Sequence, residues 1–281
     1  MRSLAVASTS VALLLGVGCD SSPRGSRDAS QEDRIAEISV RMDAPNGGYP
    51  SVSVLAYRAA VSGVGADEVL SVIDPLMLPP PGDRCSARDI ADSARTLGAQ
   101  AGGGRVELSE LSGLKVDVGM GLLQPAARVF PDLASVVSGV IGEVGPVDYG
   151  QTPTALALVD SAGNRTPTVP VAELPQLFFA DGTPLPPSPR FAVHTDLELR
   201  VKAAPGSFVE LRPFGATWAL SCPLNQERVV VPAAELAKMA ALRVPVSLEA
   251  VGRDSHPYGF GADSVRLTIE VRTSSVVELL P

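Results

Sequence analysis

The sequence contains few residues of the types that carry catalysis, metal binding or nucleic-acid binding. Its 281 residues include 2 histidines, 3 cysteines and 1 tryptophan, and the formal net charge is −8. Binding to nucleic-acid phosphates needs clustered lysines and arginines, but no basic run occurs in the chain. An anionic surface would also repel phosphates. The sequence therefore predicts no nucleic-acid partner.

Aromatic side chains make up only 4% of the chain, whereas a carbohydrate-binding module would present a platform of aromatic rings. The single tryptophan, Trp218, lies in a predicted strand at two-residue spacing from Leu220 and Cys222. The three side chains therefore share one face of the strand. We expect this face to pack in the core, which leaves Trp218 unavailable as a shelf for a ligand.

No motif for catalysis or metal binding stands out. The two histidines, His194 and His256, lie too far apart in sequence for a recognised zinc-ligand cluster, and no G-x-S-x-G motif is present. The run Asp254-Ser255-His256 contains the residue types of a hydrolytic triad, but triads are assembled from distant positions, and this proline-flanked run favours a turn. The sequence predicts no catalytic residues, metal or cofactor. An exported hydrolase with an unrecognised active site remains the alternative function.

The amino terminus has the features of a targeting segment. Arg2 precedes an apolar run of about 13 residues, 4–16, which is too short to span a bilayer but suits a secretory signal. Gly16-Val17-Gly18 then leads to Cys19. This order resembles the lipobox of bacterial lipoproteins, although the family usually has Leu, Val or Ile where this chain has Gly16. The alternative is an ordinary secretory signal followed by a chance cysteine.

The lipobox resemblance implies that residues 1–18 are a signal peptide and that Cys19 becomes lipidated, since the family's acyl chains give stable membrane anchoring. Residues 19–34 are mostly small or polar and read as a flexible tether. We expect a protein of the cell envelope, held on the periplasmic face or at the outer membrane through the lipid on Cys19. The sequence leaves the leaflet open.

Alternation of apolar and polar residues predicts strands in most of the remaining chain. Residues 38–42 and 52–56 alternate on either side of Asn46-Gly47, which predicts a hairpin. Further strands are expected at 106–109, 114–120, 135–141 and 155–159 in the first half, and at 197–202, 209–212, 244–250 and 265–271 in the second. Helical spacing predicts two short helices, at 86–97 and 232–242.

The run 181–189 holds four prolines within six residues, which cannot carry a sheet ladder, so we place a domain boundary there. The expected domains are 35–183, with a long loop and short helix inserted, and 184–281. Many strands with turn-rich joins predict a mainly β fold of two antiparallel immunoglobulin-like β-sandwich domains with one or two short helices.

This organisation resembles lipoproteins of Gram-negative bacteria that carry immunoglobulin-like modules behind a lipobox. The resemblance implies a surface or periplasmic role. We therefore expect a non-catalytic binding or structural module of the envelope, whose partner is an unknown envelope protein or glycan.

Once Cys19 is lipidated, Cys85 and Cys222 are the two cysteines left. Export would place both in an oxidising compartment, where an even pair in a secreted β protein is usually bridged. The sequence therefore predicts a Cys85–Cys222 disulfide that joins the two expected domains. The alternative is two free thiols, with Cys222 buried as a small apolar residue and Cys85 in a loop.

Overall fold

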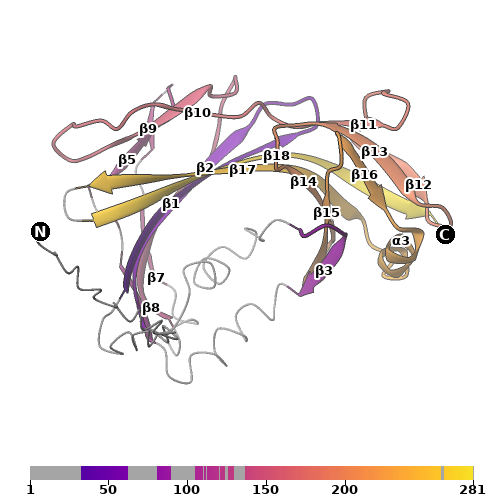
Figure 1. Cartoon of the computed structure of the whole chain (residues 1–281), viewed down its shortest axis with the longest axis horizontal. Helices are drawn as coiled ribbons and strands as arrows, with labels where there is room; N and C mark the ends of the chain where they lie inside the picture. Colours follow the sequence, from indigo (N-terminus) through magenta and orange to yellow (C-terminus); the bar gives the residue numbers. More distant parts are fainter. Residues whose placement is uncertain are drawn as a thin grey trace, which may run out of the picture.

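The computed structural model describes residues 33–62, 81–89, 105–109, 111, 113–119, 121–123, 126–129, 137–260 and 263–280. This part of the chain is mainly β and contains one helix, α3 (Ala233–Ala240). Most strand pairs are antiparallel, and the strands form one large and two small sheets (Figure 1). The mainly β class predicted from the sequence is confirmed.

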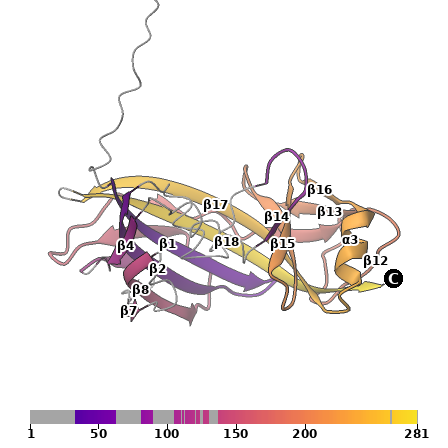
Figure 2. The same ribbon diagram turned by 90° about the horizontal axis from the view of Figure 1, so that it is seen from below.

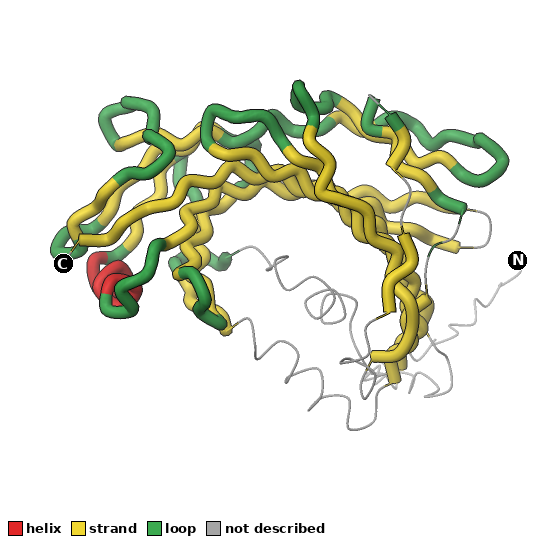
Figure 3. The backbone as a smooth tube through the Cα atoms, turned by 180° about the vertical axis from the view of Figure 1, so that it is seen from behind, coloured by secondary structure: helices red, strands yellow, loops and turns green. Residues whose placement is uncertain are grey.

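The large sheet has eleven strands and forms an arch (Figure 3). Its strands are β1 (Asp33–Pro45), β2 (Ser51–Ser62), β3 (Ser86–Asp89), β4 (Arg105–Ser109), β7 (Ala126–Val129), β8 (Val137–Asp148), β12 (Arg190–Ala192), β14 (Phe208–Pro213), β15 (Trp218–Pro223), β17 (Val246–Phe260) and β18 (Asp263–Leu280). The strand order is β3-β15-β14-β17-β18-β1-β2-β4-β8-β7, and β12 pairs with the end of β18.

The two small sheets lie on the outer side of the arch (Figure 1). One has four strands, β5 (Lys115–Asp117), β6 (Leu122–Leu123), β9 (Ala155–Val159) and β10 (Val169–Pro170). The other has three, β11 (Gln176–Phe179), β13 (Leu197–Lys202) and β16 (Arg228–Val231). Each covers one end of the large sheet, so the described part is built as layers of sheet on sheet.

Two hydrophobic cores fill the space between these layers. The first core contains Ile38, Val54 and Leu158 and lies under the four-stranded sheet. The second contains Val209 and Leu236 and lies under the three-stranded sheet and α3. Alternate residues of β18 from one end to the other contribute to both cores, so both lie on the same face of the large sheet.

The long hairpin of β17 and β18 connects the two cores. These strands have 15 and 18 residues, and they run from one end of the described structure to the other (Figure 2). On its other edge β18 pairs in parallel with β1, so the first and last strands of the described residues are neighbours. Backbone hydrogen bonds therefore join residues 36–45 to residues 265–274 in one sheet.

Several local predictions are confirmed. The hairpin around Asn46-Gly47 is formed by β1 and β2, where Val40 faces Val54 and Gly47 adopts a φ of 78°. The strand at 155–159 is β9, and the helix expected at 232–242 is α3, which buries Leu236 and Met239 against the second core.

The prediction of a helix at 86–97 is wrong for its first four residues. Ser86–Asp89 is strand β3, which pairs antiparallel with β15 from Trp218 to Ser221. The disulfide of the preceding Cys85 holds this segment beside β15, so the sheet ladder replaces the helical hydrogen bonds that local spacing favours. Residues 90–97 lie outside the described residues.

The domain boundary between residues 183 and 184 stays a prediction. Strands on both sides of it contribute to the same sheets: β3 pairs with β15, β1 pairs with β18, and β11 pairs with β13. The two cores are separate clusters, but they share the continuous hairpin of β17 and β18.

Candidate functional site

The inner face of the arch carries a row of buried charged and polar side chains, which we call the inner polar row. They alternate with the core residues along four neighbouring strands. The glutamates Glu37, Glu210 and Glu270 have no exposed surface. The row consists of Glu37, Ser39, Arg41 and Asp43 on β1; Glu210 and Arg212 on β14; Ser247, Glu249, Arg253 and Ser255 on β17; and Arg266, Thr268, Glu270 and Arg272 on β18.

Glu270 is the centre of this row. Its Oε1 accepts hydrogen bonds from Nε of Arg272 at 2.5 Å and from Nε of Arg41 at 3.2 Å, and its Oε2 accepts one from Nη2 of Arg253 at 2.6 Å. Burial raises the pKa of this carboxyl, but the three arginines outweigh it and bring the pKa down to about 2. Glu270 is therefore a fixed anion that joins β1, β17 and β18.

Glu37 forms a second cluster on the same face. Its Oε2 accepts a hydrogen bond from Nη2 of Arg266 at 2.7 Å and another from the hydroxyl of Tyr57 at 3.2 Å. Its Oε1 accepts one from Oγ1 of Thr268 at 2.8 Å. Both carboxylate oxygens are thus used, and they join β1, β2 and β18.

Arg272 extends the Glu270 cluster towards β14. Its Nη1 donates to Oε2 of Glu249 at 2.5 Å, and Oε1 of Glu249 accepts a hydrogen bond from Ser247 at 2.8 Å. Burial raises the pKa of Glu249, but the charge of Arg272 and these hydrogen bonds lower it below its ordinary value. The surrounding carboxylates overcome the burial of Arg272 and raise its guanidinium pKa.

The burial of two carboxyl groups of the inner polar row, those of Glu210 and Asp43, is not fully offset by nearby arginines. Arg212 donates to Oε1 of Glu210, but Oε2 of Glu210 is buried without a hydrogen-bond partner among the described residues. Burial raises the pKa of Glu210, and it raises that of Asp43 to about 6 despite the nearby Arg41 and Arg272. Charge on these two groups destabilises the folded state.

Replacing Asp43 with asparagine is expected to stabilise the protein by about 2 kcal/mol above pH 6. Because the folded-state pKa of Asp43 lies above its unfolded value, the folded protein binds this proton first as pH falls. The stability penalty of Asp43 is therefore fully present above pH 6 and disappears as pH falls towards 4. Urea unfolding at a series of pH values measures the difference between native protein and variant.

The matched control for this prediction is Asp148→Asn, an exposed aspartate at the end of β8. We expect it to leave the free energy of unfolding unchanged within about 0.5 kcal/mol over the same range. A difference between Asp43→Asn and native protein that is equal near pH 4 and near pH 7 would contradict the proposed burial of an ionised Asp43.

The chemistry of the inner polar row is electrostatic pairing. The described residues contain no group of three or more His, Cys, Asp or Glu side chains that could hold a metal ion. Arginines approach the carboxylates of Glu37, Glu249 and Glu270, so these oxygens already have partners. The sequence predicted the alternation of apolar and polar residues along these strands. It did not predict that the polar side chains are buried, because the contacts between them depend on the register of neighbouring strands.

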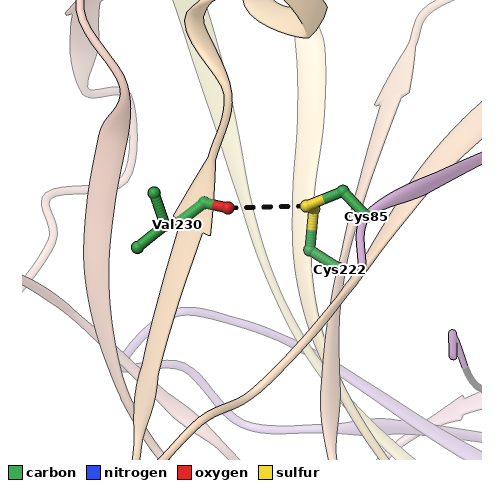
Figure 4. Close-up of a disulfide and its surroundings, with 3 residues drawn as sticks. All are labelled: Cys85, Cys222 and Val230. Carbon is green, nitrogen blue, oxygen red and sulfur yellow. Dashed lines mark hydrogen bonds between the residues drawn. A yellow bond between two sulfur atoms is a disulfide. The ribbon is translucent and has the colours of Figure 1, made fainter. Parts of the chain in front are cut away.

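Cys85 and Cys222 lie together as predicted. Their sulfurs are 2.06 Å apart, the distance of a disulfide bond, and the Sγ of Cys85 also lies 3.4 Å from the carbonyl oxygen of Val230 on β16 (Figure 4). Cys222 is fully buried in the second core, while Cys85 is partly buried against it. The bond fastens the segment before β3 to β15.

The structure does not assemble a hydrolytic triad from Asp254, Ser255 and His256. All three lie on β17, where alternate side chains point to opposite faces. The hydroxyl of Ser255 lies 3.0 Å from that of Thr268 on the inner face. Nε2 of His256 lies 2.9 Å from Oδ2 of Asp254, but in a geometry that makes no hydrogen bond. The run is thus part of a strand, and the predicted turn is wrong.

The remaining candidate residues lie elsewhere. His194 is exposed in the bend after β12, distant in sequence from the strand of His256. Trp218 packs against the second core, as predicted. Cys19 and the predicted signal peptide lie outside the described residues.

Within the described ranges, no helix is long and apolar enough to cross a membrane. Comparison of the chain with protein-family models, with curated proteins and with solved structures finds no match.

Proposed function

We propose that the protein is an exported lipoprotein of the cell envelope, anchored to a membrane through Cys19. Its folded part acts as a non-catalytic binding or structural module. The observation that carries this proposal is the Cys85–Cys222 disulfide. Disulfides persist in oxidising compartments and are rare in the reducing cytosol, so the bond agrees with a chain that is exported behind a signal peptide.

The geometry of the polar groups supports a non-catalytic role. The carboxylates of Glu37 and Glu270 are bonded to arginines and hydroxyls, so they have no free oxygen for general-base chemistry. The two histidines are placed on different elements, and Ser255 points away from His256. These contacts favour a rigid scaffold over a hydrolase.

The layered sheets support a role as a rigid platform. The hairpin of β17 and β18 passes through both cores, so a partner bound at one end would be held at a fixed position relative to the other end. We propose further that the two layered halves are immunoglobulin-like modules. The partner we propose is an envelope protein or a glycan, in addition to the membrane that holds the lipid on Cys19.

Replacing Cys19 with serine tests the anchor. We expect the native protein to fractionate with membranes and to incorporate a labelled fatty acid, and Cys19→Ser to lose both properties, because serine cannot form the thioether to the lipid. The matched control is Ser21→Ala in the predicted tether, which should fractionate like the native protein. Equal partition of native protein and Cys19→Ser into the soluble fraction would contradict the proposal.

A further inference from the structure

A groove of about 1050 Å³ lies at one end of the large sheet, between α3 and the last residues of β18. Figures 1 and 2 show α3 beside this end of β18. Here β17 begins at Val246, opposite Val277, so residues 278–280 of β18 extend past it and pair with β12. The groove is bounded by these residues, by α3 and by the turn that leads from α3 into β17. Its volume is at the upper end of the range of roughly 300–1,000 Å³ that is typical of small-molecule sites.

The wall formed by α3 carries small side chains. Ala237, Ala240 and Ala241 line the groove. Their spacing of three and four residues places them on one face of the helix and its cap. Leu236 and Met239 of the same helix are buried in the second core. The alanines therefore leave space that larger side chains on this face would fill.

The wall formed by β18 is apolar and accessible. Val276 and Leu280 line the groove and keep 42% and 40% of their surface exposed. Val244 and Pro245 add further apolar surface from the turn before β17. Single exposed apolar side chains are ordinary, but apolar surface gathered in a concave site marks a place where a ligand binds. The groove is therefore suited to a hydrocarbon chain.

The charged residues of the lining favour an anionic group on the ligand. They are Arg190, Arg243 and Glu278. Arg190 and Glu278 pair with each other at 2.8 Å. Arg243 is exposed and makes no ion pair or side-chain hydrogen bond within the described part of the chain. Charges more than about 8 Å away are largely screened at physiological ionic strength, so the net charge of −8 acts weakly on this groove.

The backbone conformation of Arg243 also points to a use for its side chain. Its φ is 54°, in the left-handed region that glycine adopts without steric cost. Its N–H donates to the carbonyl oxygen of Ala240 at 3.0 Å, and the N–H of Leu242 donates to that of Met239 at 3.1 Å. Backbone groups thus cap the end of α3, and the guanidinium is left for another contact. Residues held in unfavourable backbone conformations cluster at functional sites.

We propose that this groove binds a long-chain fatty acid. The hydrocarbon chain lies between the alanine face of α3 and the side chains of Val276 and Leu280, and the carboxylate pairs with Arg243. A single anionic group at the end of an apolar body matches both parts of the lining. No residue of the inner polar row lines the groove. This site is additional to the proposed function and does not depend on lipidation of Cys19.

The test uses cis-parinaric acid, a long-chain fatty acid whose fluorescence rises in apolar surroundings. It is titrated below its micelle concentration into the full Cys19→Ser chain, the parent chain, which has no acyl chain of its own to occupy the groove. We expect saturable binding of one probe per chain. Laurate should displace the probe, and dodecanol, which has the same chain length without the charge, should need about a fivefold higher concentration because the ion pair is lost.

Substitutions on α3 test the position of the probe. Ala237→Leu fills the groove and should weaken binding more than tenfold, and leucine is a good helix former, so the fold should be kept. The matched control is Ala234→Leu, because Ala234 is exposed on the same helix and does not line the groove. This control should bind like the parent chain. If circular dichroism shows that Ala237→Leu fails to fold, Ala241→Leu fills the groove from the same wall.

Substitutions of Arg243 test the role of its charge. Arg243→Gln removes the charge and keeps a polar side chain at the same backbone position, and we expect it to weaken binding of the probe about fivefold. Arg243→Lys keeps the charge and should bind within about twofold of the parent chain.

Each outcome either supports or contradicts the proposal. Weakened binding in the filling variant and in Arg243→Gln, with parent affinity in Ala234→Leu and near-parent affinity in Arg243→Lys, supports it. Absence of saturable binding to the parent chain overturns it. Parent affinity in the filling variant also overturns it, because the probe would then lie elsewhere. Equal displacement by laurate and dodecanol, or parent affinity in Arg243→Gln, overturns the assignment of a fatty acid and leaves a groove for neutral chains.

Discussion

Replacing Cys85 with alanine is expected to lower the free energy of unfolding by about 5 kcal/mol. The residues of the disulfide are 137 positions apart. Closing a loop of this length removes much of the conformational entropy of the unfolded chain, and the chain-entropy model gives about 5 kcal/mol for it. Since a domain is typically stable by about 5–15 kcal/mol, this loss is large. Urea unfolding followed by circular dichroism measures it.

The reduced native protein is the control for this prediction. Adding a reductant should destabilise the native protein by the same amount, and it should leave Cys85→Ala unchanged because that variant has no disulfide to reduce. Cys222→Ala adds the loss of a buried sulfur, so it should be somewhat less stable than Cys85→Ala. Equal stability of the native protein with and without reductant would contradict the predicted contribution.

Replacing Glu270 with glutamine is expected to destabilise the protein by about 3–5 kcal/mol. The change removes the charge on which Arg41, Arg253 and Arg272 converge, and Glu270 and Arg272 are almost completely buried. Buried cations that lose their counter-ion keep their desolvation cost without the attraction that offset it. Urea unfolding near pH 7 measures the loss.

The matched control is Glu278→Gln on the same strand. Glu278 pairs with Arg190 at 2.8 Å, but both side chains are more than half exposed. Exposed pairs of this kind contribute at most about 1 kcal/mol, so this variant should stay close to the native protein. Comparable losses in Glu270→Gln and Glu278→Gln would show that the inner polar row is not the electrostatic centre of the sheet.

Local elements of the fold were predictable from the sequence because their signals are local. Asn46-Gly47 between two alternating runs was sufficient to predict the hairpin of β1 and β2. Proline at residue 232, followed by Leu236 and Met239, was sufficient for α3. The pairing of Cys85 with Cys222 was predictable because they are the two cysteines left once Cys19 is lipidated and because the chain is predicted to be exported.

Non-local features could not be predicted in the same way. The parallel pairing of β1 with β18 joins segments more than 200 residues apart, and no local pattern specifies it. The burial of Glu37 and Glu270 depends on that pairing, because the register decides which arginines face each carboxylate.

Intact-mass spectrometry of the protein released from membranes by detergent tests the central proposal most directly. The sample is alkylated without reductant before the measurement. We predict a chain that starts at Cys19, carries the mass of covalent lipid and takes up no alkyl groups, because Cys85 and Cys222 are bridged. A chain without lipid, or one that keeps residues 1–18, would contradict the lipoprotein proposal, and alkylation of both cysteines would contradict the disulfide that supports export.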